Sequence, residues 1–286
     1  MQKLFKAFQQ LAPTKRFSCL HDIYVVTDQD SYLALDQVFP MHAEQQFFLD
    51  ELNREKMVGA QALEIGLGSG VLSIGAAKAG AACVTALEIN PRAKNYAGFN
   101  IMLNGVEDRV AIIDGDRQAI FKPVAGRRFD YIFSNPPFEP TPPGLDNFYH
   151  SDAGLYGLDF LEEIFKGLDE HLTDQGHAQI VTAAPGDANG PFMLVDAARK
   201  YLAGNTTIIV NPVPITFAHM AQWFAVGALA SPEQTAELIR IGERDGVSHE
   251  YLCVIHYEKG ENGLTVANAK KSYQDWEHPL GELVIG

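Results

Sequence analysis

The turn between residues 63 and 70 limits the fold of this chain more than any other sequence feature. An apolar run ends at Glu64-Ile65, and three glycines follow at alternate positions, Gly66, Gly68 and Gly70. Glycine allows positive φ angles and a close approach of another group to the backbone. A strand that breaks into such a turn and opens a helix is typical of an open parallel sheet. Val71 stands where the G-x-G-x-x-G dinucleotide fingerprint has its third glycine, so the spacing disfavours a pyrophosphate-binding turn.

After this turn, strand and helix patterns alternate along the chain. Short apolar runs predict strands at 62–65, 84–88, 110–113, 131–133, 178–183 and 207–210. Helical spacing and glycine or proline boundary signals predict helices at 71–79, 91–104, 158–172 and 192–202. This order predicts an α/β fold of the Rossmann-like kind, with a mainly parallel sheet and helices on both faces.

The two ends of the chain carry weaker patterns. Before the turn we expect a short strand at 25–26 and a helix from 42 to 57. After residue 211, segments 222–229 and 251–257 both have strand character, and either could return antiparallel. Between them, Ser231 to Gln234 resembles a capping box that opens a helix to about residue 241. The tail from residue 262 either covers a sheet edge or is loose.

Composition and charge narrow the class of protein. No apolar run approaches the ~18 residues that cross a bilayer, and no secretory signal is visible, so we expect a cytoplasmic protein with no membrane partner. Three scattered cysteines disfavour a disulfide framework or a cysteine zinc site, and no His, Cys or Asp spacing suggests a metal. The net charge of −14 and the dispersed cations favour a small-molecule or protein substrate over a nucleic acid.

Acidic residues stand at the ends of three successive predicted strands. Glu64 precedes the glycine turn, Glu88 ends the second strand, and Asp116 follows the third. A carboxylate at the end of the second strand can accept hydrogen bonds from both hydroxyls of a ribose. Asp116 could accept from an adenine amino group, whereas Glu64 is unfavourable for phosphates and suits a cation. The three acids therefore predict a nucleoside-like ligand that carries positive charge.

A second polar signal, Asn135-Pro136-Pro137-Phe138, follows the fourth predicted strand. Open parallel sheets bind their ligands at this switch point. The two prolines fix the turn and remove two backbone donors. A substrate NH2 group could donate to the Asn135 side-chain oxygen and to the Pro136 carbonyl, and Phe138 offers a flat face to a planar group. We expect Asn135, Pro136 and Phe138 to position an acceptor nitrogen.

These residues together resemble the class I S-adenosylmethionine-dependent methyltransferases, and within them the branch that carries N-P-P-[YF]. That branch modifies planar nitrogens, either in glutamine side chains of release factors and ribosomal proteins or in adenine and guanine amino groups of RNA. The resemblance covers about residues 60–185 and implies a seven-stranded sheet whose last strand is antiparallel. It implies S-adenosylmethionine as the cofactor, with Glu64 and Gly66 near the methionine end, Glu88 on the ribose and Asp116 near the adenine.

The resemblance implies a transferase that moves a methyl group to a nitrogen of a small metabolite or a protein side chain. We divide the chain into an N-terminal extension at 1–50, a candidate cover of the active site, a catalytic domain at 51–260 and a tail at 261–286. The candidate cofactor-binding residues are Glu64, Gly66, Gly68, Gly70, Glu88, Ile89, Asp116, Arg117 and Asn135.

The loop after the acceptor motif adds two catalytic candidates. Tyr149 could close over a sulfonium by cation–π attraction, and His150 could remove a proton from an amine. Phe138 replaces the tyrosine that is common in the glutamine-modifying subgroup, which leaves the acceptor open. Three alternatives therefore stand beside methylation of a metabolite or protein: intramolecular attack on another sulfonium carbon, amino methylation of an RNA base, and binding of the cofactor without turnover.

Overall fold

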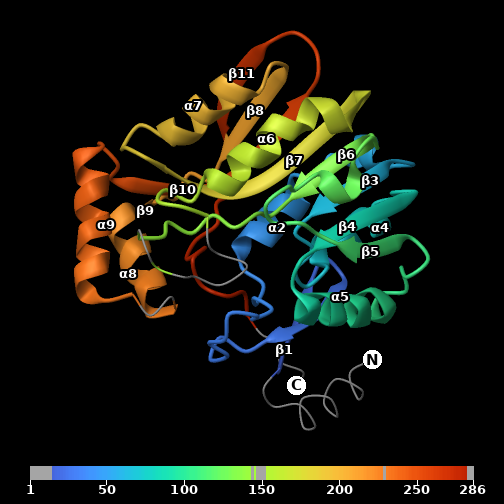
Figure 1. Cartoon of the computed structure of the whole chain (residues 1–286), viewed down its shortest axis with the longest axis horizontal. Coiled ribbons are helices and arrows are strands. Elements are labelled where there is room, and N and C mark those ends of the chain that lie inside the picture. Colours follow the sequence, from blue (N-terminus) through green and yellow to red (C-terminus); the bar gives the residue numbers. More distant parts are fainter. Residues whose placement is uncertain (1–14, 143–144, 146–152, 228–229, 282–286) are drawn as a thin grey trace.

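A computed structural model of the chain describes residues 15–142, 145, 153–227 and 230–281. A central sheet with helices on both faces makes up most of the fold (Figure 1). Its strands are β3 (Gln61–Ile65), β4 (Cys83–Glu88), β5 (Val110–Asp114), β6 (Phe129–Ser134), β7 (Leu172–Gly186), β8 (Asn205–Val210), β9 (Ile215–Thr216), β10 (His249–Glu258) and β11 (Gly263–Asn268). The predicted α/β class is confirmed.

The described strands of this sheet number nine, so the prediction of seven is wrong. Eight follow the order β11-β8-β10-β7-β6-β3-β4-β5, and β9 pairs with β10 beside this path. Strands β3 to β7 run parallel to one another, whereas β10 is antiparallel to both β7 and β8. β10 therefore confirms the antiparallel strand expected at 251–257. The extra strands are β9 and β11, and β11 pairs with β8 so that the tail covers that sheet edge.

The helices are α2 (Ala43–Asp50), α3 (Arg54–Met57), α4 (Val71–Lys78), α5 (Pro91–Leu103), α6 (Asp159–His171), α7 (Phe192–Tyr201), α8 (Phe217–Gly227) and α9 (Pro232–Arg244). A 3-10 turn, η1, spans Lys122–Val124. The predicted capping box at Ser231 is confirmed, because the Ser231 side chain and Gln234 each cap the other's backbone N–H. Among these helices none is long and apolar enough to cross a membrane, within the part of the chain that is described.

One helix prediction and one strand prediction were wrong in detail. The segment 42–57 forms α2 and α3 instead of one helix, because the Asn53 side chain accepts a hydrogen bond from the Lys56 N–H and starts a new helix. The segment 222–229 is not a strand, since residues 222–227 belong to α8 and 228–229 lie outside the described residues. A short apolar run fits a buried helix as well as a strand, and periodicity alone does not separate the two.

The sheet separates two apolar cores. On one face, α2, α4 and α5 pack against alternate residues of the strands, such as Ala62 and Phe133. On the other face, α6 and α7 cover the intervening residues, such as Leu63 and Ile132. Because side chains alternate along a strand, a sheet covered on both faces has strands that are apolar throughout. This burial holds the carboxyl ends of β3, β4 and β6 in fixed relative positions.

A hairpin outside the sheet precedes α2. It consists of β1 (Lys15–Leu20), which the sequence patterns missed, and β2 (Ile23–Asp28), which confirms the predicted short strand at 25–26. The buried side chain of Asn100, on α5, accepts from the Val26 N–H at 2.8 Å and donates to the Val26 carbonyl at 3.0 Å. These two bonds satisfy backbone groups of β2 that a neighbouring strand would otherwise pair. They attach the N-terminal segment to α5.

Candidate active site

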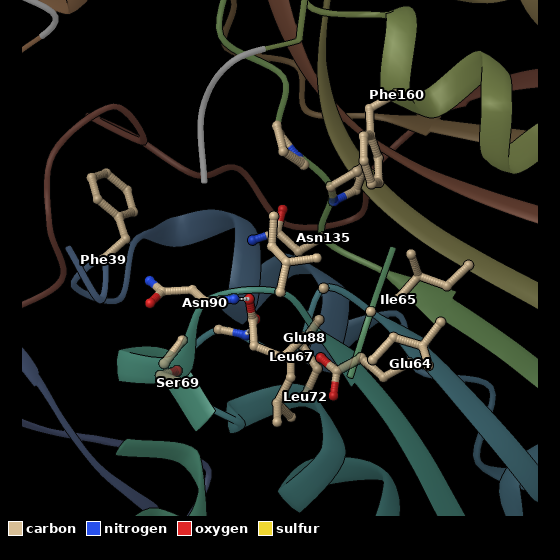
Figure 2. Close-up of a pocket in the computed structure, with 18 of the residues that line it drawn as sticks. Phe39, Glu64, Ile65, Leu67, Ser69, Leu72, Glu88, Asn90, Asn135 and Phe160 are labelled. Atoms are coloured by element: carbon tan, nitrogen blue, oxygen red, sulfur yellow. Dashed lines mark hydrogen bonds between the residues drawn. The ribbon is translucent and has the colours of Figure 1, made fainter. Parts of the chain in front are cut away.

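A pocket lies at the carboxyl ends of β3, β4 and β6 (Figure 2). It is lined by ten of the predicted site residues: Glu64, Gly66, Gly68, Glu88, Ile89, Asp116, Arg117, Asn135, Pro136 and Phe138. Gly70 does not line it, and Tyr149 and His150 lie outside the described residues. Strands β3 and β6 are direct neighbours, so residues that are about seventy positions apart in the sequence meet at one end of the sheet.

The glycine turn forms one wall of this pocket. Gly66, Gly68 and Gly70 have φ angles of 80°, 54° and 85°, in the left-handed region that favours glycine. A Cβ atom on Gly66 or Gly68 would meet no atom within 4 Å, so the space beside them is open. A Cβ on Gly70 would lie 3.2 Å from the Cβ of Ala97, so Gly70 serves the packing of α4 on α5.

Glu88 ends β4 with its carboxylate turned back to the glycine turn. Its Oε2 accepts from the Gly68 N–H at 2.7 Å, and its Oε1 accepts from the Asn90 N–H at 2.8 Å. Burial raises the pKa of Glu88, while these two N–H donors act to lower it. A carboxylate oxygen has two lone pairs, so each oxygen of Glu88 keeps one acceptor site after these bonds.

Glu64 is a second carboxyl group of the pocket and is only 1% exposed. The Ser73 hydroxyl on α4 donates a hydrogen bond to its Oε2. Burial raises the pKa of Glu64 well above its ordinary value, and the neighbouring charge of Glu88 raises it further. The free protein therefore disfavours the ionised form of Glu64, and a nearby positive charge would favour that form.

In the order of strands across the sheet, Asp116 and Asn135 lie on opposite sides of the glycine turn, because Asp116 follows β5 and Asn135 follows β6. Its Oδ1 accepts from the N–H groups of Gln118 and Ala119, at 3.0 and 3.1 Å, and its Oδ2 pairs with Lys122 at 3.0 Å. The pairing with Lys122 and the two backbone donors lower the pKa of Asp116. This carboxylate is therefore charged at pH 7 and is fixed in place by its own loop.

Asn135 follows β6 and lines the same pocket as Glu64 and Glu88 (Figure 2). The preceding residue is anchored, because the Ser134 hydroxyl donates to the Ile65 carbonyl at 2.6 Å. The Asn135 Oδ1 atom is buried and has no hydrogen-bond partner among the described residues. A buried acceptor without a donor is costly in a folded protein, so this atom is a strong candidate for ligand binding.

The structure adds pocket residues that the sequence patterns missed. Phe39 and Phe160 flank the pocket, and Figure 2 shows Asn135 between them. Gln37, Glu44 and Gln45 also line it from the N-terminal segment. Short motifs could not identify these residues, because they reach the pocket only through tertiary packing. The acidic first turn of α2, which holds Glu44, was the one available signal.

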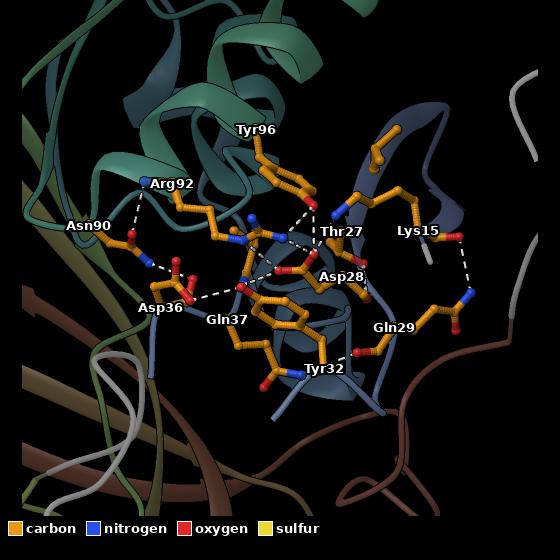
Figure 3. A network of polar contacts seen from close by, with 12 residues as sticks. Lys15, Thr27, Asp28, Gln29, Tyr32, Asp36, Gln37, Asn90, Arg92 and Tyr96 are labelled. Atoms are coloured by element: carbon orange, nitrogen blue, oxygen red, sulfur yellow. Dashed lines mark hydrogen bonds and ion pairs between the residues drawn. The ribbon is translucent and has the colours of Figure 1, made fainter. Parts of the chain in front are cut away.

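A polar network holds this N-terminal wall in place (Figure 3). Its centre is Asp28, which is 0% exposed and accepts hydrogen bonds from three side chains and a backbone N–H. The donors are Arg92 Nη2 at 2.6 Å, Tyr96 Oη at 2.6 Å, Lys15 Nζ at 2.8 Å and Val38 N at 3.0 Å. These bonds lower the pKa of Asp28 to about 2, against the effect of burial.

The network also reaches Glu88. Asn90 donates from its side chain to the Asp36 carbonyl at 3.0 Å and from its backbone to Glu88 at 2.8 Å. The Asn90 side chain in turn accepts from the Arg92 N–H at 2.9 Å. The loop that carries Gln37 and Val38 is therefore joined to the same short segment that positions the Glu88 carboxylate. No group of three or more His, Cys, Asp or Glu side chains suited to a metal occurs among the described residues.

Comparison with known proteins gives this pocket a family context. Residues 41–136 match the family model described as ribosomal protein L11 methyltransferase (PrmA). A release factor glutamine methyltransferase from Geobacter sulfurreducens is 32% identical over 149 residues, which cover 49% of this chain and 50% of that protein. A tRNA1(Val) (adenine(37)-N6)-methyltransferase from Shewanella amazonensis is 34% identical over 125 residues, which cover 43% of this chain and 53% of that protein.

A solved structure supports the fold. The S-adenosylmethionine-dependent methyltransferase from Agrobacterium tumefaciens superposes with a TM-score of 0.55 at 16% identity, over 86% of this chain and 71% of that one. The chain spans only about half the length of the two curated relatives. The comparisons confirm the predicted resemblance to methyltransferases: residues 41–136 match a methyltransferase family model, and Glu64, Glu88 and Asn135 lie in this matched part.

Proposed function

We propose that this protein is an S-adenosylmethionine-dependent methyltransferase that modifies a planar nitrogen, with a protein side-chain amide as the favoured acceptor. One observation carries the proposal. The buried Asn135 Oδ1, which has no partner among the described residues, lines the same pocket as the carboxyl groups of Glu64 and Glu88. The pocket therefore pairs an unfilled acceptor for an N–H donor with acidic groups that suit a cationic ligand.

The residues present fit the proposed cofactor. The open space beside Gly66 and Gly68 admits a ligand against the backbone of the turn. Glu88 keeps one acceptor site on each oxygen, enough for two ribose hydroxyls. We assign Glu64 to the positively charged end, because its raised pKa makes it a group that gains stability when a cation lies beside it. Asp116, with its neighbours Ile89 and Arg117, is assigned to the base.

The acceptor end has a different character. Asn135 Oδ1 and the Pro136 carbonyl are acceptors, and Phe39, Phe138 and Phe160 line the pocket with aromatic rings. An NH2 group that donates to both oxygens keeps its lone pair free, while a ring face holds the planar group to which it belongs. Glutamine amides and adenine amines both have this shape.

When bound, S-adenosylmethionine supplies a methyl group attached to a cationic sulfur. Asn135 and Pro136 orient the acceptor nitrogen toward that methyl group, so that much of the rate enhancement comes from alignment. The apolar aromatic walls exclude water from the reacting atoms. The acidic groups of the pocket favour the charged cofactor over its neutral product, which promotes exchange after transfer.

A protein acceptor is preferred to RNA for a physical reason. The chain has a net charge of −14 and does not carry a run of basic residues beyond pairs such as Arg127-Arg128. Phosphate backbones bind to clustered lysine and arginine, because affinity there depends on the release of counterions. The adenine-modifying relative nevertheless makes tRNA the second candidate, since it is 34% identical to this chain over 125 residues.

The test is methyl transfer from S-adenosylmethionine with a tritiated methyl group. The protein is incubated with ribosomal proteins and release factors, with total tRNA, and with a small-metabolite extract, in parallel reactions. We expect label in protein that resists nuclease treatment. Enzymatic digestion of that protein to amino acids should then release the label as an amino acid with a methylated side-chain amide. Label in tRNA alone would favour the second candidate function, methylation of tRNA, over methylation of a protein. Failure of the protein to bind S-adenosylmethionine would refute both, and methylthioadenosine as the product would favour cyclisation instead.

A further inference from the structure

Glu44 is a buried carboxyl group of the pocket that the proposed function leaves without a role. It lies in the first turn of α2, is 3% exposed, and lines the pocket together with Asn135. Burial raises its pKa to about 8, and the nearby charge of Glu139 acts in the same direction. Such a group is retained in a core only when donors surround it.

The donors that surround Glu44 are fixed by the helix start. In the capping box of α2, Gln45 Oε1 accepts from the His42 N–H at 2.6 Å. The oxygen of the Gln45 amide is therefore committed, and its nitrogen must point the other way. That nitrogen donates to Glu44 Oε1 at 3.0 Å. The His42 N–H thus fixes the orientation of the Gln45 amide, and this orientation directs the amide nitrogen to the Glu44 carboxyl group.

Asn135 is the next group in this chain of contacts. Its side chain interacts with the Glu44 carboxyl and acts, like Gln45, to lower the pKa of that carboxyl. An interaction that lowers the pKa favours the ionised carboxyl, which accepts hydrogen bonds and donates none, so in that form the Asn135 amide nitrogen faces Glu44. The Oδ1 atom then points away from Glu44, and it is the buried atom without a partner among the described residues.

We propose that Glu44 is a positioning residue that sets which way the Asn135 amide faces: it accepts from Nδ2 and leaves Oδ1 for the N–H of the methyl acceptor. The kinetic consequence rests on the proposed function, whereas the orientation itself does not. If the amide were reversed, it would present a donor to the acceptor NH2 group, and the hydrogen bond that orients the nitrogen would be lost.

The chain offers a matched pair of substitutions that separates orientation from charge and size. In Glu44→Gln, Gln45 still donates to the oxygen of the new amide, so the new NH2 group faces Asn135 and turns its Oδ1 inward. In the double variant Glu44→Gln with Gln45→Glu, the new carboxylate at position 45 still accepts from the His42 N–H, because capping boxes use Glu or Gln at this position. That carboxylate also accepts from the new amide nitrogen, and the oxygen of residue 44 again receives Asn135 Nδ2.

The orientation is measured without any acceptor. Carbon-detected spectra of asparagine-labelled protein at pH 9, above the pKa of about 8 of Glu44, report the Cγ and Nδ2 signals of Asn135. Asn135→Ala identifies these signals by their disappearance. We expect them to move in Glu44→Gln and to return in the double variant. Glu55→Gln, an exposed position on α3, is the control for the loss of one charge and leaves the signals unchanged.

Turnover is also measured at pH 9, where Glu44 is ionised, on the acceptor that the methyl-transfer screen identifies. We expect Glu44→Gln to lower kcat by about 10- to 100-fold, the range for one misplaced buried hydrogen bond, with unchanged affinity for S-adenosylmethionine. The double variant is expected to recover most of that loss. Each variant is first checked for a wild-type melting temperature and cofactor affinity, which removes variants that fail to fold.

Two results would overturn the inference. One is an Asn135 signal that stays at its wild-type position in Glu44→Gln. The other is a folded double variant whose signals or kcat stay at the Glu44→Gln values. A failure of the methyl-transfer screen bears on the proposed function alone, because the spectra still decide how the Asn135 amide faces. If Asn135→Ala transfers methyl groups at the normal rate, the proposed acceptor role is wrong even where the spectra support the orientation.

Discussion

Replacement of Asp28 by asparagine tests the network that holds the N-terminal wall of the pocket. Asp28 is fully buried and accepts charged hydrogen bonds from Arg92 and Lys15 as well as one from Tyr96. Asparagine keeps the shape and one accepting oxygen but removes the charge. Because Arg92 and Lys15 stay in place, the variant leaves two cations without their partner, and the loss of stability exceeds that of a surface ion pair.

The pKa of Asp28 gives the magnitude. A pKa that is lowered from 3.8 to about 2 corresponds to roughly 2 kcal/mol of stability at pH 7. The folded-state value lies below the ordinary one, so this contribution is complete above about pH 4 and is lost as the pH falls through 2. At about pH 3 roughly half of it remains.

The assay is urea unfolding of the wild type and Asp28→Asn at several pH values between 7 and 3. We expect the wild type to be more stable by about 2 kcal/mol at pH 7, and the gap to narrow to about half at pH 3. The control is Asp30→Asn, since Asp30 is exposed and pairs with Arg16 at the surface. It should change the free energy of unfolding by less than about 1 kcal/mol. A gap that is absent at pH 7, or that does not narrow with acid, would refute the assigned role of Asp28.

Three further predictions concern ligand binding and turnover. Glu88→Ala should weaken S-adenosylmethionine binding by about 10- to 100-fold, because two hydroxyl contacts to a charged acceptor are lost; an unchanged calorimetric affinity would remove Glu88 from the ribose site. Asn135→Ala should leave that affinity within about twofold and lower kcat by about 10- to 100-fold, and normal turnover in a methyl-transfer assay would contradict this. Binding of S-adenosylmethionine near pH 7 should release up to about one proton more than binding of S-adenosylhomocysteine, because the cation lowers the raised pKa of Glu64. Calorimetry in two buffers of different ionisation enthalpy counts these protons, and Glu64→Gln should abolish the difference.

Much of the fold could be predicted because the patterns involved are local. The run from β3 through α5 has strong boundary signals, including a glycine turn and a proline at the first position of α5. The segment 222–227 was predicted wrongly, because an apolar run of that length has no period that separates a strand from a buried helix. The edge strand β11 was missed as a strand because it is exposed and depends on pairing with β8 for its conformation.

The residues of the candidate site likewise fall into those that the sequence could identify and those that it could not. Glu64, Glu88 and Asn135 could be identified because each lies at or just after the carboxyl end of a strand, and parallel strands bring these ends to one edge. Phe39, Glu44 and Phe160 could not, since they come from segments whose place depends on how the chain packs. Gly70 is the converse case. Its spacing groups it with Gly66 and Gly68, yet it does not line the pocket, and a Cβ there would meet Ala97 on α5.

The sequence by itself determined which segments near the turn form strands and helices, the acidic groups at the strand ends and the acceptor motif, because each depends on backbone geometry within a few residues. Only the tertiary structure decided the charge states and the orientation of those groups. The pKa of Glu64 is raised because its carboxyl is buried beside that of Glu88, whereas the pKa of Asp28 is lowered because Arg92 and Lys15 donate to its carboxyl. Desolvation and hydrogen bonding depend on residues that are distant in the chain, and those neighbours exist only after the core has formed.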